Sequence, residues 1–303
     1  MRIGLYLNEP SGPDAIAKLE ERIARAADAG FASAWLSNIF GLDALTALAA
    51  AGARVADIEL GTAVVPTYPR HPAVLAQQAL TADLALGGRL ALGIGLSHRL
   101  VIEEMYGYSY DKPVRHMREY LSVLGPLLRG EQADFDGETL RAHIGLGTPR
   151  ASEKVPLLLA ALAPRMLRLA GETADGTILW MTGPKTIAEH VVPAITEAAR
   201  EAGRPSPRIV CSLPVAVTGD KDAARERASE VFAIYGTLPS YRAMLDREGA
   251  AGPGDVAIVG DEDEVAAEIA HLAAIGVTDF AAATFAVEDD ADRTRRFLKG
   301  LLS

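Results

Sequence analysis

The residues best suited to chemistry lie between positions 59 and 98, where two apolar runs each end in small and polar residues. The runs are Glu59 to Val65 and Leu90 to Ile94, and a helical pattern separates them. In parallel α/β proteins, the carboxyl ends of neighbouring strands face a common ligand. We therefore expect Thr62 to Pro66 and Gly95 to His98 to line one site.

Among the six histidines, His98 is the first candidate for catalysis, because an imidazole that directly follows a strand end can hydrogen-bond a ligand. His116, in a polar helical stretch, faces either the same site or solvent. His71 precedes Pro72 at a helix start, and we expect it to cap or pack there. The histidines show no metal-ligand spacing with Cys, Asp or Glu, so we predict no metal site. Ser97 lacks a glycine two residues later, which argues against a serine hydrolase.

A second candidate binding element is the run of small residues Ala160 to Ala163, which ends a strand-like segment just before Pro164. Pro164 fits the first position of a helix, whose free amide groups and dipole favour an anion such as phosphate. A close-packed turn without a ligand is the alternative on this segment alone.

Strand-like and helical patterns alternate eight times along the chain. The strand-like runs are Ile3–Leu7, Ser33–Leu36, Glu59–Val65, Leu90–Ile94, Pro156–Ala160, Gly176–Trp180, Ile209–Val217 and Asp279–Val287. Apolar residues recur every three or four positions between them, for example at Ile16, Leu19, Ile23 and Ala27. Eight such units predict a single α/β domain over residues 1–303, a closed (β/α)8 TIM barrel. An open doubly wound sheet is the competing fold, but the first strand lacks a Rossmann fingerprint.

Two segments exceed this repeat. Residues Asp134 to Ala142 have Asp-Gly at their centre and predict a small hairpin. Residues Tyr235 to Gly254 are rich in Tyr, Pro and Gly, which suits a lid over the barrel mouth. We interpret both as substrate-side insertions at the C-terminal mouth; surface decoration or a dimer contact is the alternative.

Composition limits the partners. The chain has 303 residues, 49% of them hydrophobic, and a formal net charge of −10, which argues against binding nucleic acid or an anionic membrane surface. A single cysteine, Cys211, cannot form an internal disulfide. Neither a signal peptide nor an apolar run of about 18 residues is recognisable. We therefore expect a cytoplasmic protein.

Four motifs, L-G-T-A-V-V-P, R-H-P-x-x-x-A-x-Q, G-G-R-L-x-L-G-I-G and A-A-L-x-P-R-M-L-R-L-A-G-E-x-A-D-G, together resemble those of the bacterial luciferase-like flavin and deazaflavin oxidoreductases. The resemblance is closest to the coenzyme F420-dependent branch and extends from Ile3 to the last helix. It implies a luciferase-like barrel that holds a deazaflavin at the carboxyl ends of its strands.

The resemblance also implies where the cofactor binds. A non-prolyl cis peptide of the family falls at Ala63-Val64, behind the ring, and the phosphate-binding amides fall at Ala160, Ala161, Leu162 and Ala163. Relatives often have Asp and His after the second strand, where this chain has Ser37 and Asn38. Together with the strand-end residues, the expected cofactor contacts are Asn38, Thr62, Ala63, Val64, Gly95, Ser97, Ala160, Ala161, Leu162 and Ala163.

On the substrate side, His98 occupies a position where a related sugar-phosphate dehydrogenase has an acid, and we expect it to be the catalytic proton donor or substrate anchor. Tyr6 replaces a glutamate of the tetrahydromethanopterin reductases. Further substrate-side candidates are Tyr6, His116, Tyr235 and Tyr241.

The resemblance implies hydride transfer between C5 of F420 and a small organic substrate, with reduction of a C=C or C=N bond favoured over alcohol oxidation. The alternatives are an FMN-dependent monooxygenase fed by a separate flavin reductase, and a non-catalytic flavin- or deazaflavin-binding barrel. A homodimer is expected from relatives.

Overall fold

Eight parallel strands form a closed barrel in the computed structural model, which describes residues 1–286 and 288–302. The barrel strands, in order around it, are β1 (Arg2–Leu7), β2 (Ser33–Leu36), β3 (Glu59–Thr62), β5 (Leu90–Gly95), β8 (Leu157–Leu159), β9 (Gly176–Trp180), β10 (Arg208–Val217) and β12 (Asp279–Thr284). The ring closes because β12 pairs with both β10 and β1. The predicted TIM barrel is therefore confirmed, and the open-sheet alternative is wrong.

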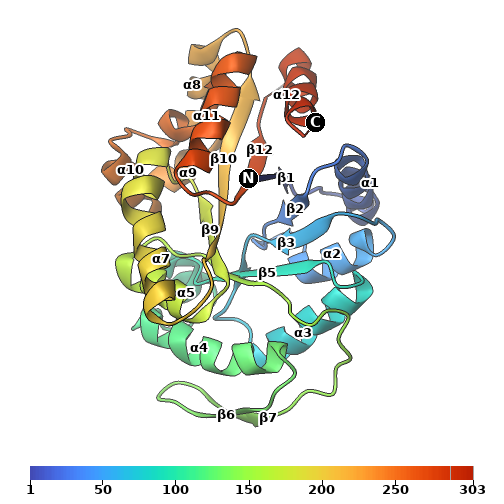
Figure 1. Cartoon of the computed structure of the whole chain (residues 1–303), viewed down its shortest axis with the longest axis vertical. Coiled ribbons are helices and arrows are strands. Elements are labelled where there is room, and N and C mark those ends of the chain that lie inside the picture. The colour runs from blue at the N-terminus through green and yellow to red at the C-terminus, as the bar shows by residue number, and fades with distance from the viewer. Residues whose placement is uncertain (287, 303) are drawn as a thin grey trace.

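Helices surround the barrel (Figure 1). They are α1 (Ala15–Asp28), α2 (Ala44–Gly52), α3 (Pro72–Ala85), α4 (Pro113–Leu128), α5 (Pro164–Thr173), α6 (Pro184–Thr186), α7 (Val192–Glu201), α8 (Lys221–Val231), α9 (Ala233–Thr237), α10 (Pro239–Glu248), α11 (Glu262–Ala274) and α12 (Glu288–Gly300). Three further helical segments are the π-helices η1 (Val101–Met105) and η2 (Ile187–Val191) and the 3-10 helix η3 (Pro253–Val256). The predicted amphipathic face of α1 is confirmed at Leu19 and Ile23, which are fully buried, but Ile16 is exposed.

The third barrel strand differs from the single run predicted by the sequence. It is split into β3 and β4 (Val65–Pro66), and the peptide bond between Ala63 and Val64, in the gap, is cis. The expected cis peptide is thus confirmed. A strand not expected from the sequence, β11 (Ile258–Gly260), pairs with the carboxyl end of β10. The last strand is shorter than expected, because β12 ends at Thr284; position 287 lies outside the described residues.

The predicted hairpin is confirmed as the antiparallel pair β6 (Ala133–Asp136) and β7 (Arg141–Ile144), which lies outside α4 (Figure 1). The carboxylate of Glu119, on α4, accepts hydrogen bonds from the backbone N–H groups of Glu138, Thr139 and Leu140 at 2.9 to 3.0 Å. These bonds hold the hairpin turn against the first half of α4.

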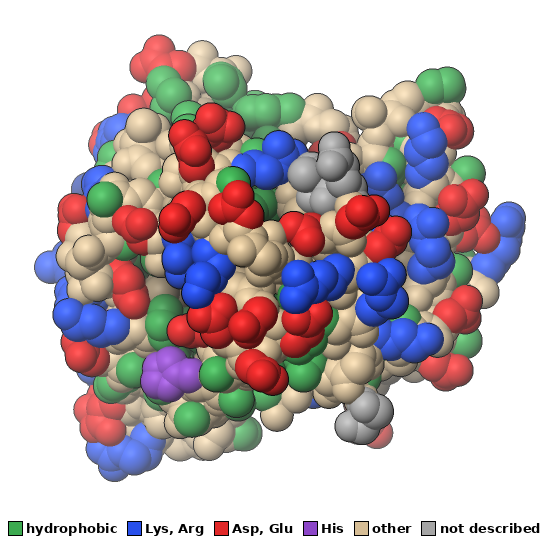
Figure 2. Space-filling view, turned by 90° about the horizontal axis from the view of Figure 1, so that it is seen from above, with side chains coloured by type: hydrophobic (Ala, Val, Ile, Leu, Met, Phe, Trp, Pro, Cys, Tyr) green, Lys and Arg blue, Asp and Glu red, His purple; other side chains and the backbone are tan. Residues whose placement is uncertain are grey.

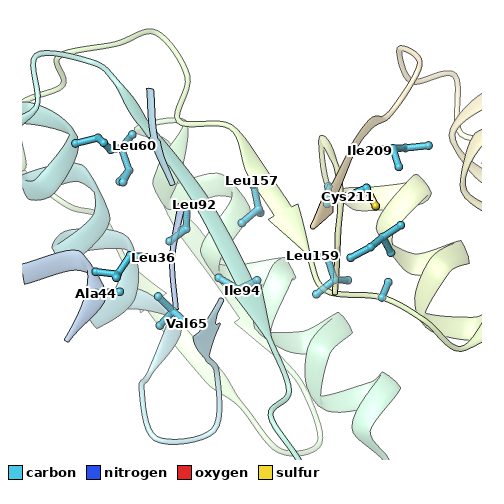
Figure 3. Packing of buried hydrophobic residues seen from close by; sticks show 14 of the residues in the cluster. Leu36, Ala44, Leu60, Val65, Leu92, Ile94, Leu157, Leu159, Ile209 and Cys211 are labelled. Carbon is cyan, nitrogen blue, oxygen red and sulfur yellow. The ribbon is translucent and has the colours of Figure 1, made fainter. Parts of the chain in front are cut away.

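Two apolar layers stabilise the barrel. Alternate strand residues such as Leu157 and Leu159 pack outward against the helices (Figure 3), whereas Leu158 between them belongs to a separate cluster inside the barrel. Trp35 is the largest side chain of this inner cluster, and Gly61 leaves the space for it: a Cβ at position 61 would lie 2.2 Å from the indole ring. The inner cluster lies directly below the residues of the barrel mouth.

A partly buried ion cluster of Arg2, Arg208, Glu59 and Asp279 links the opposite, amino-terminal ends of the strands. One guanidinium nitrogen of Arg208 lies 2.6 Å from carboxylate oxygens of both Glu59 and Asp279. The same guanidinium lies 5.4 Å from the centre of the Trp35 ring. The pKa of Arg208 is raised by its hydrogen bonds and charge attraction to these carboxylates, which outweigh burial. This cluster therefore ties β3, β10 and β12 together below the inner layer.

No helix in the described ranges is long and apolar enough to cross a membrane.

Candidate active site

A cleft with two lobes opens at the carboxyl ends of the barrel strands. The inner lobe, of about 310 Å³, extends to the loop between β8 and α5, and the outer lobe, of about 370 Å³, extends to η1 and α9. The residues common to both lobes are Tyr6, Ala63, Val64, Ser97, His98, Trp180 and Tyr241. The strand ends Ala63 to Val64 and Ser97 to His98 therefore face one cleft, as the sequence predicts.

The inner lobe is lined at one end by Ala160 to Ala163, between β8 and the first turn of α5. The N–H of Ala160 pairs with the carbonyl of Ile94 at 2.9 Å, so this amide is not available to a ligand. Within the described ranges, the N–H groups of Ala161, Leu162 and Ala163 have no protein acceptor. Three free amides at a helix start, in the wall of a cleft, are suited to an anionic oxygen.

One histidine fixes the conformation of this loop. The Nε2 of His190, on η2, donates a hydrogen bond of 2.8 Å to the carbonyl oxygen of Leu162. With that carbonyl held from one side, the neighbouring amides keep their orientation. His190 was not among the candidate site residues.

A sharp turn after β5 directs His98 into the cleft. Ser97 adopts a left-handed conformation with φ of 60°, and its carbonyl accepts a hydrogen bond of 3.2 Å from the Tyr110 hydroxyl. The His98 ring then lies against Tyr241, with ring centres 5.6 Å apart. Burial lowers the pKa of His98 below its ordinary value, so the imidazole is neutral at neutral pH.

Aromatic side chains form a wall of the cleft that runs from β1 to β9. The rings of Tyr6 and Trp180 stack with centres 5.3 Å apart, and the Tyr6 hydroxyl donates to the carbonyl of Ala63 at 3.3 Å. Tyr235 and Tyr241, from α9 and α10, extend this wall. Burial raises the pKa of the Tyr6, Tyr235 and Tyr241 hydroxyls, so all three stay protonated at neutral pH.

The predicted lid is confirmed in its position: the segment from residue 235 contains α10 and η3, and Tyr235, Leu238 and Tyr241 line the outer lobe. The hairpin does not line either lobe. Its turn, at Glu138 to Leu140, lies instead beside a separate cleft on the outer flank of α4.

The loop after β2 contributes Ser37 and Asn38 to the outer lobe. The Asn38 side-chain oxygen accepts a hydrogen bond of 3.0 Å from the N–H of Ala44, so its amide NH2 group is the part left for a ligand. Thr62 lies behind the cleft wall, where its hydroxyl both donates to and accepts from the backbone of Gly93. It ties β3 to β5 and lines neither lobe. Gly95 lines the inner lobe.

His116 does not reach either lobe. Its ring stacks on Tyr68 with centres 3.9 Å apart, and its Nε2 lies 3.0 Å from the Thr67 hydroxyl, on the outer flank of α4. Burial lowers its pKa to about 4. His71 caps α3, since its Nδ1 accepts from the N–H of Ala73 at 3.2 Å, and the expected capping role is confirmed.

Sequence reasoning missed several lining residues. Trp180 is the last residue of β9, and the strand-end rule applied to His98 would have found it. The apolar residues of the outer lobe carry no such signal, because exposed hydrophobic residues in loops do not reveal which cleft they line. These residues are Ile39, Phe40, Leu100, Val101, Met105, Tyr106, Ile234 and Leu238.

The chain is similar in sequence to a known protein family and to individual enzymes. The family model described as luciferase-like monooxygenase matches residues 1–279. The chain is 28% identical over 242 residues to a 5,10-methylenetetrahydromethanopterin reductase of Methanolobus tindarius, an alignment that covers 79% of this chain and 73% of that one. It is 29% identical over 235 residues, 71% of this chain and 67% of the other, to a Mycobacterium tuberculosis protein provisionally named a coenzyme F420-dependent oxidoreductase.

Among solved structures, the coenzyme F420-dependent tetrahydromethanopterin reductase of Methanopyrus kandleri has a TM-score of 0.77 to this chain. The sequence identity is 24%, and the match covers 98% of this chain and 97% of that one. At this identity the likeness shows a shared fold.

Proposed function

The chain belongs to the luciferase-like monooxygenase family, and from that premise we propose that it is an F420-dependent oxidoreductase whose two-lobed cleft holds the deazaflavin and a small organic substrate. The relative provisionally named a coenzyme F420-dependent oxidoreductase supports the choice of cofactor. The observation that carries the proposal furthest is the set of three unpartnered amides, at Ala161 to Ala163, in the wall of the inner lobe.

The residues present fit such a cofactor. A phosphate is suited to the free amides, because neither lobe is lined by a lysine or arginine among the described residues. The backbone from Ala63 to Val64 and the glycine at position 95 leave a wall of small groups on which a flat ring can lie. A Cβ at Gly95 would lie 2.7 Å from the Val64 side chain, so this wall has no room for a larger residue. We propose that Asn38, Ala63, Val64, Gly95 and Ser97 contact the ring.

When bound, the reduced deazaflavin would supply a hydride from C5 and, on its two-electron oxidation, release one ring N–H proton, so that its loss balances the hydride and the proton that the substrate's double bond gains. The protein positions the reactants and excludes water. We propose that this double bond is C=C or C=N.

His98 is the proposed catalytic residue on the substrate side. Because its pKa is lowered by burial, its neutral imidazole is better suited to donate a hydrogen bond to the substrate's polar atom than to act as a cationic acid. Tyr241, whose ring contacts His98, offers a second protonated donor in the same cleft. The two groups together would hold the substrate's acceptor atom and stabilise negative charge that develops on it.

A turnover screen tests this function. Purified protein is mixed with reduced F420 and a panel of enones, imines and ketones, and appearance of the oxidised deazaflavin is followed by its absorbance. We expect turnover with an enone or imine that His98→Ala reduces strongly. Turnover only with reduced FMN and oxygen would instead establish the monooxygenase alternative.

A further inference from the structure

The rim of the outer lobe is formed by apolar side chains that are left exposed to solvent. They come from three separate elements: the loop after β2, the segment around η1, and α9. The members are Ile39, Phe40, Leu100, Met105, Tyr106 and Ile234, each exposed over 41 to 62% of its surface. Exposed apolar groups gathered around one cavity mark a site for an apolar ligand.

The same lobe contains no charged side chain. Among the described residues that line it, none is Asp, Glu, Lys or Arg, and its polar groups are Ser37, Asn38, Ser97, His98 and tyrosine hydroxyls. Burial lowers the pKa of His98 and raises the pKa of Tyr6, Tyr235 and Tyr241, which favours the neutral form of each. The outer lobe is therefore electrically neutral at neutral pH.

Other parts of the surface differ sharply from this rim. The cleft between α1 and α12 is lined by Arg22, Arg25, Arg295, Arg296 and Lys299. On the face formed by α8, α11 and α12, acidic and basic side chains are interleaved (Figure 2). The chain has 40 acidic and 30 basic residues, so the absence of charged side chains from the outer lobe does not follow from the overall composition and is specific to this site.

From this contrast, and resting on the function proposed above, we propose that the substrate is an uncharged molecule with an apolar body and a single polar acceptor group that reaches His98. A carboxylate or phosphate on the substrate would lose its hydration in the outer lobe without gaining a counter-ion. An alkyl or aromatic body would instead be buried against Phe40, Met105 and Ile234. The apolar rim thus selects the substrate, and the His98 and Tyr241 groups orient it.

A matched pair of enones tests the charge requirement. Methyl 3-oxocyclohex-1-ene-1-carboxylate and its free carboxylate share a ring and a reducible bond and differ in one negative charge. We expect kcat/KM with reduced F420 to be at least about 100-fold higher for the ester, the effect of an unpaired charge in a dry site. Equal values, or a preference for the carboxylate, would overturn the proposal.

Ester length tests the apolar rim. Each methylene added from methyl to butyl should lower KM about two- to fourfold, since burying one methylene contributes about 0.8 kcal/mol at most. Phe40→Ser and Met105→Ser should flatten this dependence. Val74→Ser is the matched control, because Val74 is 57% exposed on α3 and lines no lobe of the cleft. A length dependence unchanged by both rim variants would contradict the assignment.

Two further outcomes are distinguishable. Light scattering of the same variants shows whether the rim is an interface between copies of the chain; loss of a dimer by Phe40→Ser and Met105→Ser, with KM values unchanged, would overturn the proposal in favour of that interface. If F420 does not bind, the proposed function fails on its own. In that case, calorimetric titration of the purified protein with the ester and with the carboxylate tests the substrate class separately. A dissociation constant at least about tenfold lower for the ester than for the carboxylate supports the uncharged substrate.

Discussion

Replacing Ala161 by leucine tests directly whether the inner lobe binds the cofactor through its backbone. Ala161 is 1% exposed and lies between β8 and α5, next to the free amides. A leucine adds three carbon atoms where the wall is already packed. Overpacking of this kind costs about 1 to 3 kcal/mol. If the added side chain enters the lobe, this cost corresponds to an F420 dissociation constant about 5- to 150-fold higher.

The assay is a titration of F420 into each variant, followed by its fluorescence. Ala161→Gly keeps the amide and adds no bulk, so we expect its affinity to stay within a few fold of the wild-type value. Ala267→Leu, at an exposed position on α11, controls for the effect of a new leucine on folding. If Ala161→Leu melts normally and binds F420 as tightly as the wild type, the phosphate binds elsewhere and the reasoning is refuted.

Three further predictions concern His98, His190 and the ion cluster. His98→Ala should lower kcat about 10²- to 10³-fold with little change in F420 affinity, as removal of one preorganised donor does. Since burial lowers the pKa of His98 and its neutral form is the proposed donor, wild-type kcat/KM should not decline as the pH rises from about 6.5 to 8; a decline over that range that His98→Ala removes would show that the imidazolium is the required acid and would contradict this role. His190→Ala removes the hydrogen-bond donor to the Leu162 carbonyl and should raise the F420 dissociation constant about tenfold without lowering the melting temperature of the protein. An unchanged dissociation constant would show that His190 does not support the binding loop. Arg208→Leu leaves Glu59 and Asp279 with only Arg2 as a cationic partner, at 3.4 Å, and should lower the free energy of unfolding by about 1.5 to 3 kcal/mol, whereas Arg200→Leu, which breaks an exposed pair, should have little effect; denaturant titration that finds equal losses would show that the cluster is not stabilising.

The strands could be predicted from the sequence because their signal is local. Leu157 and Gly176 to Trp180 lie in apolar runs bounded by helical patterns. All eight barrel strands begin within one residue of the expected position, and six of them also end within one. The exceptions at their ends are β3, which stops at Thr62, and β12, which stops at Thr284. The short strand β11 could not be predicted, because Ile258 to Gly260 is only three residues long. It pairs with the carboxyl end of β10, and no local sequence pattern indicates this pairing.

Site residues next to strand ends could likewise be placed, as His98 and Ala161 show. Thr62 illustrates the limit. It ends a strand as the rule requires, but its hydroxyl bonds to Gly93 behind the wall, and a sequence does not reveal which face of a strand end meets the cleft. His190 lies 28 residues from Leu162, whose carbonyl it holds, so only the packed structure brings it to the site.

Whether this cleft is an F420 site can be decided by a paired titration of the two candidate cofactors. Purified protein is titrated with F420 and, separately, with FMN under the same conditions, each in oxidised and reduced form. We expect saturable F420 binding that Ala161→Leu weakens, and FMN binding at least about tenfold weaker. FMN binding as tight as F420 binding or tighter, or F420 binding that Ala161→Leu leaves unchanged, would contradict this expectation.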